Sequence, residues 1–89
     1  MSLDEQFNKA VDDVKNLVKT PSDTELLEIY ALYKQGTVGD VNTDKPGLLD
    51  FKGKAKWEAW NGKKGTPVEA AKQKYVDTVK QLIEKYGLK

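Results

Sequence analysis

The chain of 89 residues contains no cysteine, no histidine and no arginine. Without cysteine it has no disulfide framework and no thiolate nucleophile, and without histidine it has no nucleophile–histidine pair. A zinc site built on these two residue types is excluded as well. Any general base near neutral pH would have to be a carboxylate or lysine with a strongly shifted pKa. The missing residues therefore favour a binding protein over an enzyme, and we expect no catalytic residue, no metal and no cofactor.

The basic residues are all lysines, 15 of them against 14 acidic residues, so the formal net charge is only +1. Lysines recognise anions as compact single charges, because the planar bidentate fork belongs to arginine. A near-neutral chain lacks the broad basic excess of a nucleic-acid-binding protein, so no nucleic-acid partner is expected. No apolar stretch approaches transmembrane length, and the acidic N-terminus is unlike a secretory signal. These features predict one monomeric, cytoplasmic domain over residues 1–89, without stable membrane insertion.

Apolar residues recur at helical spacing in four segments, and no segment alternates as a strand would. The first predicted helix runs from Leu3 to Val18, with Ser2 and Glu5 placed as a capping box. The second runs from about Pro21 to Gln35, with two overlapping cap options at its start. It has too many apolar residues for one narrow stripe, so we expect it to contact neighbours or a ligand on more than one side.

A turn-rich connection follows the second helix. Residues 36–49 are rich in Gly, Asp, Asn and Pro and are longer than the usual turn between antiparallel helices. A connection of this length could carry the chain across the molecule. A third helix is predicted over Phe51–Asn61 with Asp50 as its cap. The fourth begins with Thr66 as cap and ends at Gly87. The whole pattern predicts an all-α bundle.

The second and third helices carry the most informative side chains. Tyr30, Tyr33 and Lys34 share one face of the second helix, and Lys52 and Lys56 lie one turn apart on the third. Aromatic rings offered beside ammonium groups suit an aromatic ring that carries phosphate, such as a nucleotide. Ordinary half-buried packing of the tyrosines and a solvated basic face are the alternatives that the residues alone leave open.

Residues 30–60 combine these side chains with turn residues in a fixed order, which reads YALYKQGTVGDVNTDKPGLLDFKGKAKWEAW. This segment resembles the acyl-CoA-binding protein (diazepam-binding inhibitor) family. The resemblance extends over nearly the whole chain and includes Phe7 and Lys15 in the first helix and Tyr75 in the fourth. It implies a four-helix bundle of up-down-down-up topology, with a long connection between the second and third helices. Gly36 departs from the family pattern, where a better helix former is usual, and predicts a loosened end of the second helix.

The resemblance also implies a ligand and a function. The ligand would be a long-chain fatty acyl-CoA ester, bound with high affinity by an intracellular acyl-CoA carrier and pool former of fatty acid metabolism. Donor and acceptor enzymes would be its partners. The implied ligand-binding residues are Lys15, Tyr30, Tyr33, Lys34, Lys52, Lys56 and Tyr75. The implied contacts of the acyl chain are Phe7, Ala10, Leu26 and Leu27.

Two other functions stay open at this stage. Members of the same family are ascribed a receptor-modulating role, so a protein-interaction module or a signalling peptide precursor is one alternative. A helical module that binds a nucleotide without a lipid is the other.

Overall fold

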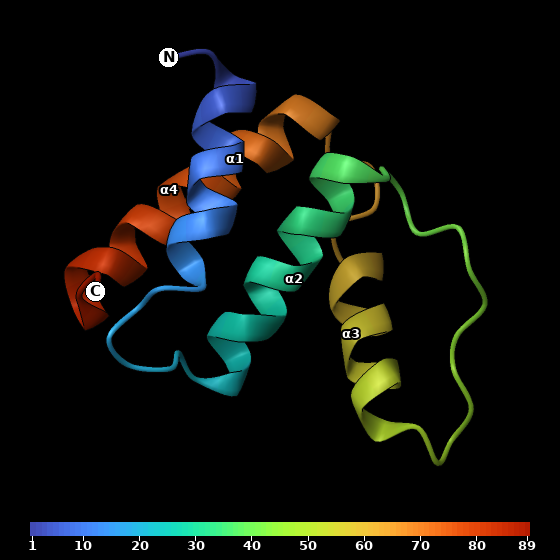
Figure 1. The fold of residues 1–89 in the computed structure, drawn as a ribbon. Coiled ribbons are helices and arrows are strands. Elements are labelled where there is room, and N and C mark those ends of the chain that lie inside the picture. Colours follow the sequence, from blue (N-terminus) through green and yellow to red (C-terminus); the bar gives the residue numbers. More distant parts are fainter.

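The computed structural model describes all 89 residues and contains four helices and no β-sheet. α1 covers Leu3–Val14, α2 covers Asp23–Thr37, α3 covers Phe51–Asn61 and α4 covers Val68–Tyr86. In Figure 1, α1 and α4 run downward while α2 and α3 run upward, which is the up-down-down-up topology. The connection between α2 and α3 returns along the outer side of α3, so these two helices are parallel. The predicted all-α bundle and its topology are confirmed.

The core lies between α1, α2 and α4. α4 packs against α1 and α2, while α3 packs against α2 alone. Ile29 and Leu32 of α2 belong to this core, and α2 also packs against α3. This helix therefore contacts neighbours on more than one side, as its sequence predicts. The main cluster of nine core residues includes none from α3, although Trp60 of α3 is itself buried. The nine are Phe7, Ala10, Leu17, Ile29, Leu32, Tyr75, Val76, Val79 and Leu82.

Three of the four helices begin with a side-chain cap. The Ser2 hydroxyl and the Asp50 carboxylate each accept a hydrogen bond from the backbone N–H three residues on, as predicted. At α2 the option at Ser22 forms, and it is a complete capping box with Glu25. The reciprocal half of the box predicted at Ser2 does not form, because the Glu5 side chain meets the Ser2 hydroxyl instead of its backbone N–H.

The predicted cap of α4 is wrong. No side chain caps this helix; Pro67 precedes it with extended backbone, φ −57° and ψ 143°. The Thr66 carbonyl oxygen accepts a hydrogen bond of 2.8 Å from the Gln35 side chain. Thr66 is therefore used to hold the start of α4 against α2 and does not satisfy the free N–H groups of α4.

The predicted end of α1 is also wrong, because the helix stops at Val14 and not at Val18. Leu17 is buried and pairs with Leu88 in an isolated antiparallel bridge. The Val18 N–H donates to the Gly87 carbonyl over 2.8 Å. Gly87 ends α4 as predicted, with a φ of 84° that favours glycine. Both residues that resemble a last helical turn thus pair with the C-terminal end of the chain, which buries Leu17, whereas Val18 stays exposed.

Gly36 does not loosen α2, which continues helical through Thr37. The glycine is buried, and a β-carbon at this position would lie 3.1 Å from the Lys72 Cγ of α4. Such a contact is tighter than ordinary van der Waals packing. The absence of a side chain at Gly36 therefore lets α4 approach α2 closely.

The long connection is fastened by two indoles of α3. The Trp57 Nε1–H donates to the Thr43 carbonyl and the Trp60 Nε1–H to the Gly39 carbonyl, each over 2.8 Å. Both tryptophans therefore hold the connection against α3.

A polar network centred on Gln35 adds a second anchor. Its buried amide nitrogen donates to the Asp40 carboxylate over 2.8 Å, in addition to its bond with Thr66. The same carboxylate accepts the Gly65 N–H over 2.9 Å. The Gly65 and Gln35 bonds hold the pKa of Asp40 below its usual range. One acid thus joins the connection after α2 to the loop before α4.

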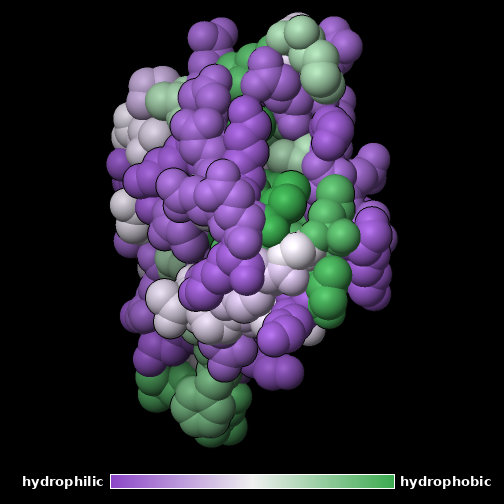
Figure 2. Space-filling model, turned by 90° about the vertical axis from the view of Figure 1, so that its left-hand side faces the viewer, coloured by the Kyte–Doolittle hydropathy of each residue, from purple (hydrophilic) through white to green (hydrophobic).

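The molecule measures 37 × 27 × 15 Å along its principal axes. The face that shows α1 and α4 is largely hydrophilic, and apolar residues gather at its lower end (Figure 2). None of the four helices combines the length and the apolar composition required to cross a membrane.

Candidate ligand-binding site

One face of α2 is turned away from the core and carries the residues singled out by the sequence. Leu26, Leu27, Tyr30, Tyr33 and Lys34 follow one another at helical spacing, so they form a continuous stripe. The side chains of Leu26 and Tyr33 are 40% and 39% exposed, which is a large fraction for apolar and aromatic residues. This stripe is therefore available to a ligand.

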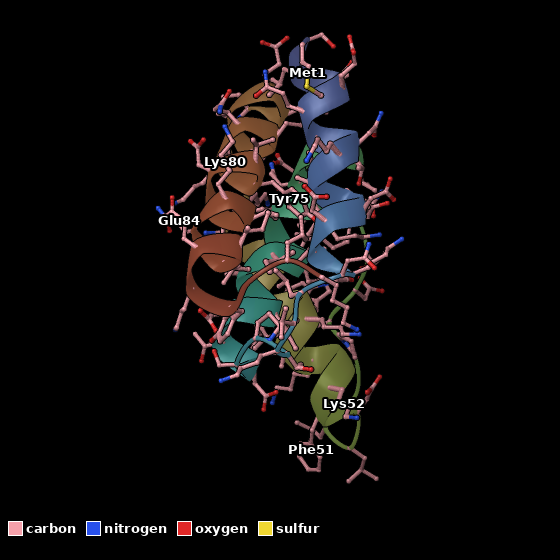
Figure 3. All side chains as sticks on the ribbon, turned by 60° about the vertical axis from the view of Figure 1, so that its left-hand side comes forward. Met1, Phe51, Lys52, Tyr75, Lys80 and Glu84 are labelled. Atoms are coloured by element: carbon pink, nitrogen blue, oxygen red, sulfur yellow. The ribbon has the colours of Figure 1, made fainter.

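α3 supplies the facing wall. Phe51 and Ala55 lie one turn apart and face α2, as do Lys52 and Lys56. Between the two helices lies a groove of about 440 Å³, a volume within the range of small-molecule sites. It is lined by Asp23, Leu26, Leu27, Tyr30, Phe51, Lys52, Ala55 and Lys56. Figure 3 shows Phe51 and Lys52 at the free lower end of α3.

Two lysines cross from one helix to the ring of the other. The Lys34 ammonium of α2 lies 5.0 Å from the centre of the Trp60 ring of α3. The Lys56 ammonium of α3 lies 5.4 Å from the centre of the Tyr30 ring of α2. Neither lysine forms an ion pair, and neither does Lys52, whereas five other lysines of the chain do. Ammonium groups without a carboxylate partner remain free to neutralise a bound phosphate.

Tyr75 lies in the core behind this site and is only 2% exposed. Its ring centre is 4.9 Å from that of Phe7 and 6.3 Å from that of Tyr33. Burial, together with the nearby Tyr33, raises the pKa of Tyr75 to about 12. Tyr75, which the family resemblance implies as a ligand-binding residue, is thus packed as part of the core and is not exposed at the groove.

Tyr33 connects the core to the site. Its ring lies parallel to that of Phe7, at 12° and with 6.0 Å between ring centres, and the side chain remains partly exposed. One part of the ring is thus packed on α1 while another is accessible. An accessible aromatic face of this kind can stack on a base.

Six residues of the predicted ligand set do not line the α2–α3 groove. Tyr33 and Lys34 continue the α2 stripe outside its lining, and the other four lie on or next to α1 and α4. Phe7 and Ala10 are buried in the core, and Ala10 lines a different groove, between α1 and α4. Lys15 directly follows α1, is exposed and forms no ion pair. The assignment of Phe7 and Ala10 to the acyl-chain groove therefore has no support in the arrangement of this groove.

Three lining residues, Asp23, Phe51 and Ala55, were not predicted from the sequence. For Phe51 and Ala55 a signal was present, because they are four residues apart and directly precede Lys52 and Lys56. Elsewhere in the chain, no group of three or more Asp, Glu, His or Cys side chains could hold a metal ion. The α2–α3 groove thus combines an apolar lining with free ammonium groups and aromatic rings.

Comparison with known proteins agrees with this geometry. The profile of the family described as "Acyl CoA binding protein" matches residues 4–79. The acyl-CoA-binding protein homolog of Drosophila melanogaster is 60% identical over 85 residues, which cover 96% of this chain and 99% of the homolog. Acyl-CoA-binding protein 2 of Oryza sativa has a crystal structure that superimposes with a TM-score of 0.90 at 41% identity, over 93% of this chain and 90% of that one. The ACBP of Moniliophthora perniciosa superimposes with a TM-score of 0.87 at 47% identity, over 96% of this chain and 83% of that one. The chain belongs to the acyl-CoA-binding protein family.

Proposed function

We propose that this protein binds long-chain fatty acyl-CoA esters in the α2–α3 groove and carries them in the cytoplasm without transforming them. The observation that carries the proposal is the combination of an apolar groove with unpaired lysines and exposed aromatic rings along the same two helices. A ligand that fits both parts has a long apolar chain at one end and phosphates with an aromatic base at the other. Acyl-CoA has this composition.

The parallel direction of α2 and α3 gives the groove two different ends. Leu26 and Phe51 lie near the starts of their helices, whereas Lys34 and Trp60 lie near the ends. The apolar and the cationic–aromatic parts of each helix are thus at the same level. We expect the acyl chain to lie over Leu26, Leu27 and Phe51, with the head group toward Lys34.

The head group has a defined set of expected contacts. Lys34 and Lys56 are expected to neutralise the 3′-phosphate of the ribose, because their ammonium groups have only aromatic partners in the protein. Tyr33 is expected to pack on the adenine through the part of its ring that Phe7 leaves uncovered. Lys52, at the rim of the groove, is expected to lie along the ligand.

The two parts of the ligand contribute differently to binding. Burial of a methylene contributes about 0.8 kcal/mol, so about ten buried methylenes contribute roughly 8 kcal/mol. Such a free energy corresponds to micromolar affinity before the head group is counted. Hydrophobic burial has no direction, so charge-assisted contacts with the phosphates would fix the orientation and add affinity. Donor and acceptor enzymes would then take up the ligand by exchange.

Titration calorimetry with three ligands tests the proposal. We expect tight binding of a long-chain acyl-CoA and much weaker binding of free CoA and of the free fatty acid, because each of these offers only half of the ligand. Equal affinity for CoA and acyl-CoA would instead identify a nucleotide-binding module. No binding of any of the three would reject the groove as an acyl-CoA site.

A further inference from the structure

A cluster of exposed apolar side chains projects from the start of α3. Leu48, Leu49 and Phe51 are 78%, 90% and 74% exposed, far more than the other large apolar residues apart from Met1. We call these three residues the apolar tip. Figure 2 shows apolar residues gathered at the lower end of the molecule, and Figure 3 shows Phe51 at that end, at the start of α3.

The apolar tip is held by local hydrogen bonds. The Asp50 N–H donates to the Gly47 carbonyl over 3.1 Å, which closes the turn that carries both leucines. The Asp50 carboxylate then accepts the Gly53 N–H over 3.0 Å and starts the helix. The three apolar side chains make no contribution to the core. Folding therefore gives no reason for their presence at the surface.

Unpaired lysines follow directly behind the apolar tip. Lys52, Lys54 and Lys56 form no ion pair, and the single acid of α3, Glu58, is neutralised by Lys45 at 2.8 Å. With the rise of an α-helix, Lys52 lies about 1.5 Å and Lys56 about 7.5 Å beyond Phe51 along the helix axis. The positive charges thus begin at the level of the apolar residues and continue away from them.

We propose that the apolar tip docks on the surface of a lipid bilayer that carries anionic headgroups. Leu48, Leu49 and Phe51 enter the boundary between headgroups and acyl chains, and the lysines of α3 meet the headgroup phosphates. The depth matches, because interfacial segments bury their apolar residues by about 5–10 Å. The partner is a bilayer and not a protein, because the surface that three side chains offer is far smaller than the roughly 800 Å² that each partner buries in a stable protein interface. The charge of the lysines complements the negative surface of an anionic leaflet.

Docking at this place brings the bilayer to the apolar end of the groove. Phe51 belongs both to the apolar tip and to the groove lining, next to Leu26 and Leu27. The end of the groove that we expect to hold the acyl chain therefore opens where the protein meets lipid. This last consequence rests on the proposed acyl-CoA function, whereas docking itself does not require a ligand.

Flotation of ligand-free protein with phosphatidylcholine vesicles, with and without phosphatidylserine, tests the docking. We expect binding to the vesicles that contain phosphatidylserine and a loss of this binding at high salt. The double variant Leu48→Ser/Leu49→Ser should bind these vesicles roughly tenfold more weakly for each leucine, which corresponds to about 1.4 kcal/mol apiece. Vesicle binding that is the same for the double variant and the unchanged protein, or no vesicle binding by the unchanged protein, would overturn the proposal.

Val68→Ser is the matched control. Val68 is also an exposed aliphatic residue, 41% accessible, but it begins α4 at the opposite end of the molecule (Figure 1). Its replacement should leave vesicle binding unchanged. Acyl-CoA titration of Leu48→Ser/Leu49→Ser separates the two proposals, because neither leucine lines the groove. Intact acyl-CoA binding with lost vesicle binding supports docking, and intact vesicle binding without acyl-CoA binding rejects only the carrier function.

A spectroscopic readout places the apolar tip in the lipid. Because the chain has no cysteine, Leu49→Cys accepts a single polarity-sensitive dye. Its emission should shift to the blue on anionic vesicles, while the same dye on Val68→Cys should not respond. Sedimentation of the protein without lipid tests whether a second copy of the chain binds the apolar tip instead. Self-association that Leu48→Ser/Leu49→Ser abolishes, together with an unresponsive dye on vesicles, would make the apolar tip a protein interface and overturn the proposal.

Discussion

Substitution of Tyr75 separates packing from ligand contact. The ring is 2% exposed and packs on Phe7 with 4.9 Å between ring centres, so Tyr75→Ala leaves a cavity in the core. Removal of a buried aromatic side chain costs about 3–5 kcal/mol. A domain of this size has a free energy of unfolding of roughly 4–13 kcal/mol, at about 0.05–0.15 kcal/mol per residue. We therefore expect Tyr75→Ala to lower the free energy of unfolding by about 3–5 kcal/mol, roughly a quarter or more of the total.

Tyr75→Phe keeps the ring and removes only the hydroxyl, which forms no hydrogen bond within the protein. Gln35 Oε1 is the buried side-chain polar atom without a partner, so the Tyr75 hydroxyl keeps contact with solvent and its removal should change the free energy of unfolding little. If the hydroxyl contacts acyl-CoA, as the family resemblance implies, Tyr75→Phe should weaken binding by about 0.5–1.5 kcal/mol. That loss corresponds to roughly a twofold to thirteenfold change in affinity.

Urea unfolding and calorimetry on both variants measure the two effects separately. Tyr86→Phe provides the matched control, because the Tyr86 hydroxyl donates a hydrogen bond to Glu25. It should lower the free energy of unfolding and leave acyl-CoA affinity unchanged. A stable Tyr75→Ala variant would refute the core position of Tyr75. Unchanged acyl-CoA affinity of Tyr75→Phe would remove its hydroxyl from the ligand site.

Three further outcomes are expected. Across a series of acyl-CoA esters, calorimetric affinity should rise about threefold to fourfold per methylene and level off once the groove is full; a flat series would exclude an acyl-chain site. Lys34→Ala and Lys56→Ala should each weaken acyl-CoA binding by about 1.5–3 kcal/mol, but far less with an ester that lacks the 3′-phosphate, while Lys80→Ala should have little effect. Equal losses with both esters would mean that the two lysines do not contact that phosphate. Hydrogen bonds from Tyr86, from the Ser22 backbone and from Lys85 together lower the pKa of Glu25 from 4.5 to about 2, so their stabilisation is present above pH 4.5 and is lost as the pH falls toward 2. In urea unfolding at several pH values, the free energy of unfolding should therefore fall less on acidification for Glu25→Gln than for the unchanged protein. The same dependence on pH in both proteins would contradict this.

Local signals were enough to predict α3 residue by residue. Asp50 supplies its cap within three residues, and a glycine follows its last residue. The end of α1 depends instead on the chain terminus, because Leu17 and Val18 are paired with residues some seventy positions away. Periodicity marks such residues as apolar but does not say which partner buries them. Thr66 was misassigned for the same reason, since its carbonyl is bound by Gln35 of α2.

The site was predictable as two helix faces but not as a groove. Helical spacing places Tyr30 and Lys34 on one face of α2 and the pair Lys52 and Lys56 on one face of α3, and the structure brings these faces together. Which helices are neighbours is decided by packing and by the long connection. The acyl-chain set therefore included residues of α1 that face the core, and it missed Phe51, which faces α2.

The attachment of α3 to α2 alone gives the ligand a structural role of its own. α3 has one buried residue, Trp60, and contributes none to the main core cluster, so few of its contacts are buried. A helix with so few buried contacts opens locally at low free energy. An acyl chain between α2 and α3 would complete a second, smaller core made partly of ligand, and chains of different length would fit because α3 can shift without repacking α1 and α4. Hydrogen exchange of the α3 amides should therefore slow in proportion to acyl-CoA affinity, while the amides of α4 keep the protection set by global unfolding.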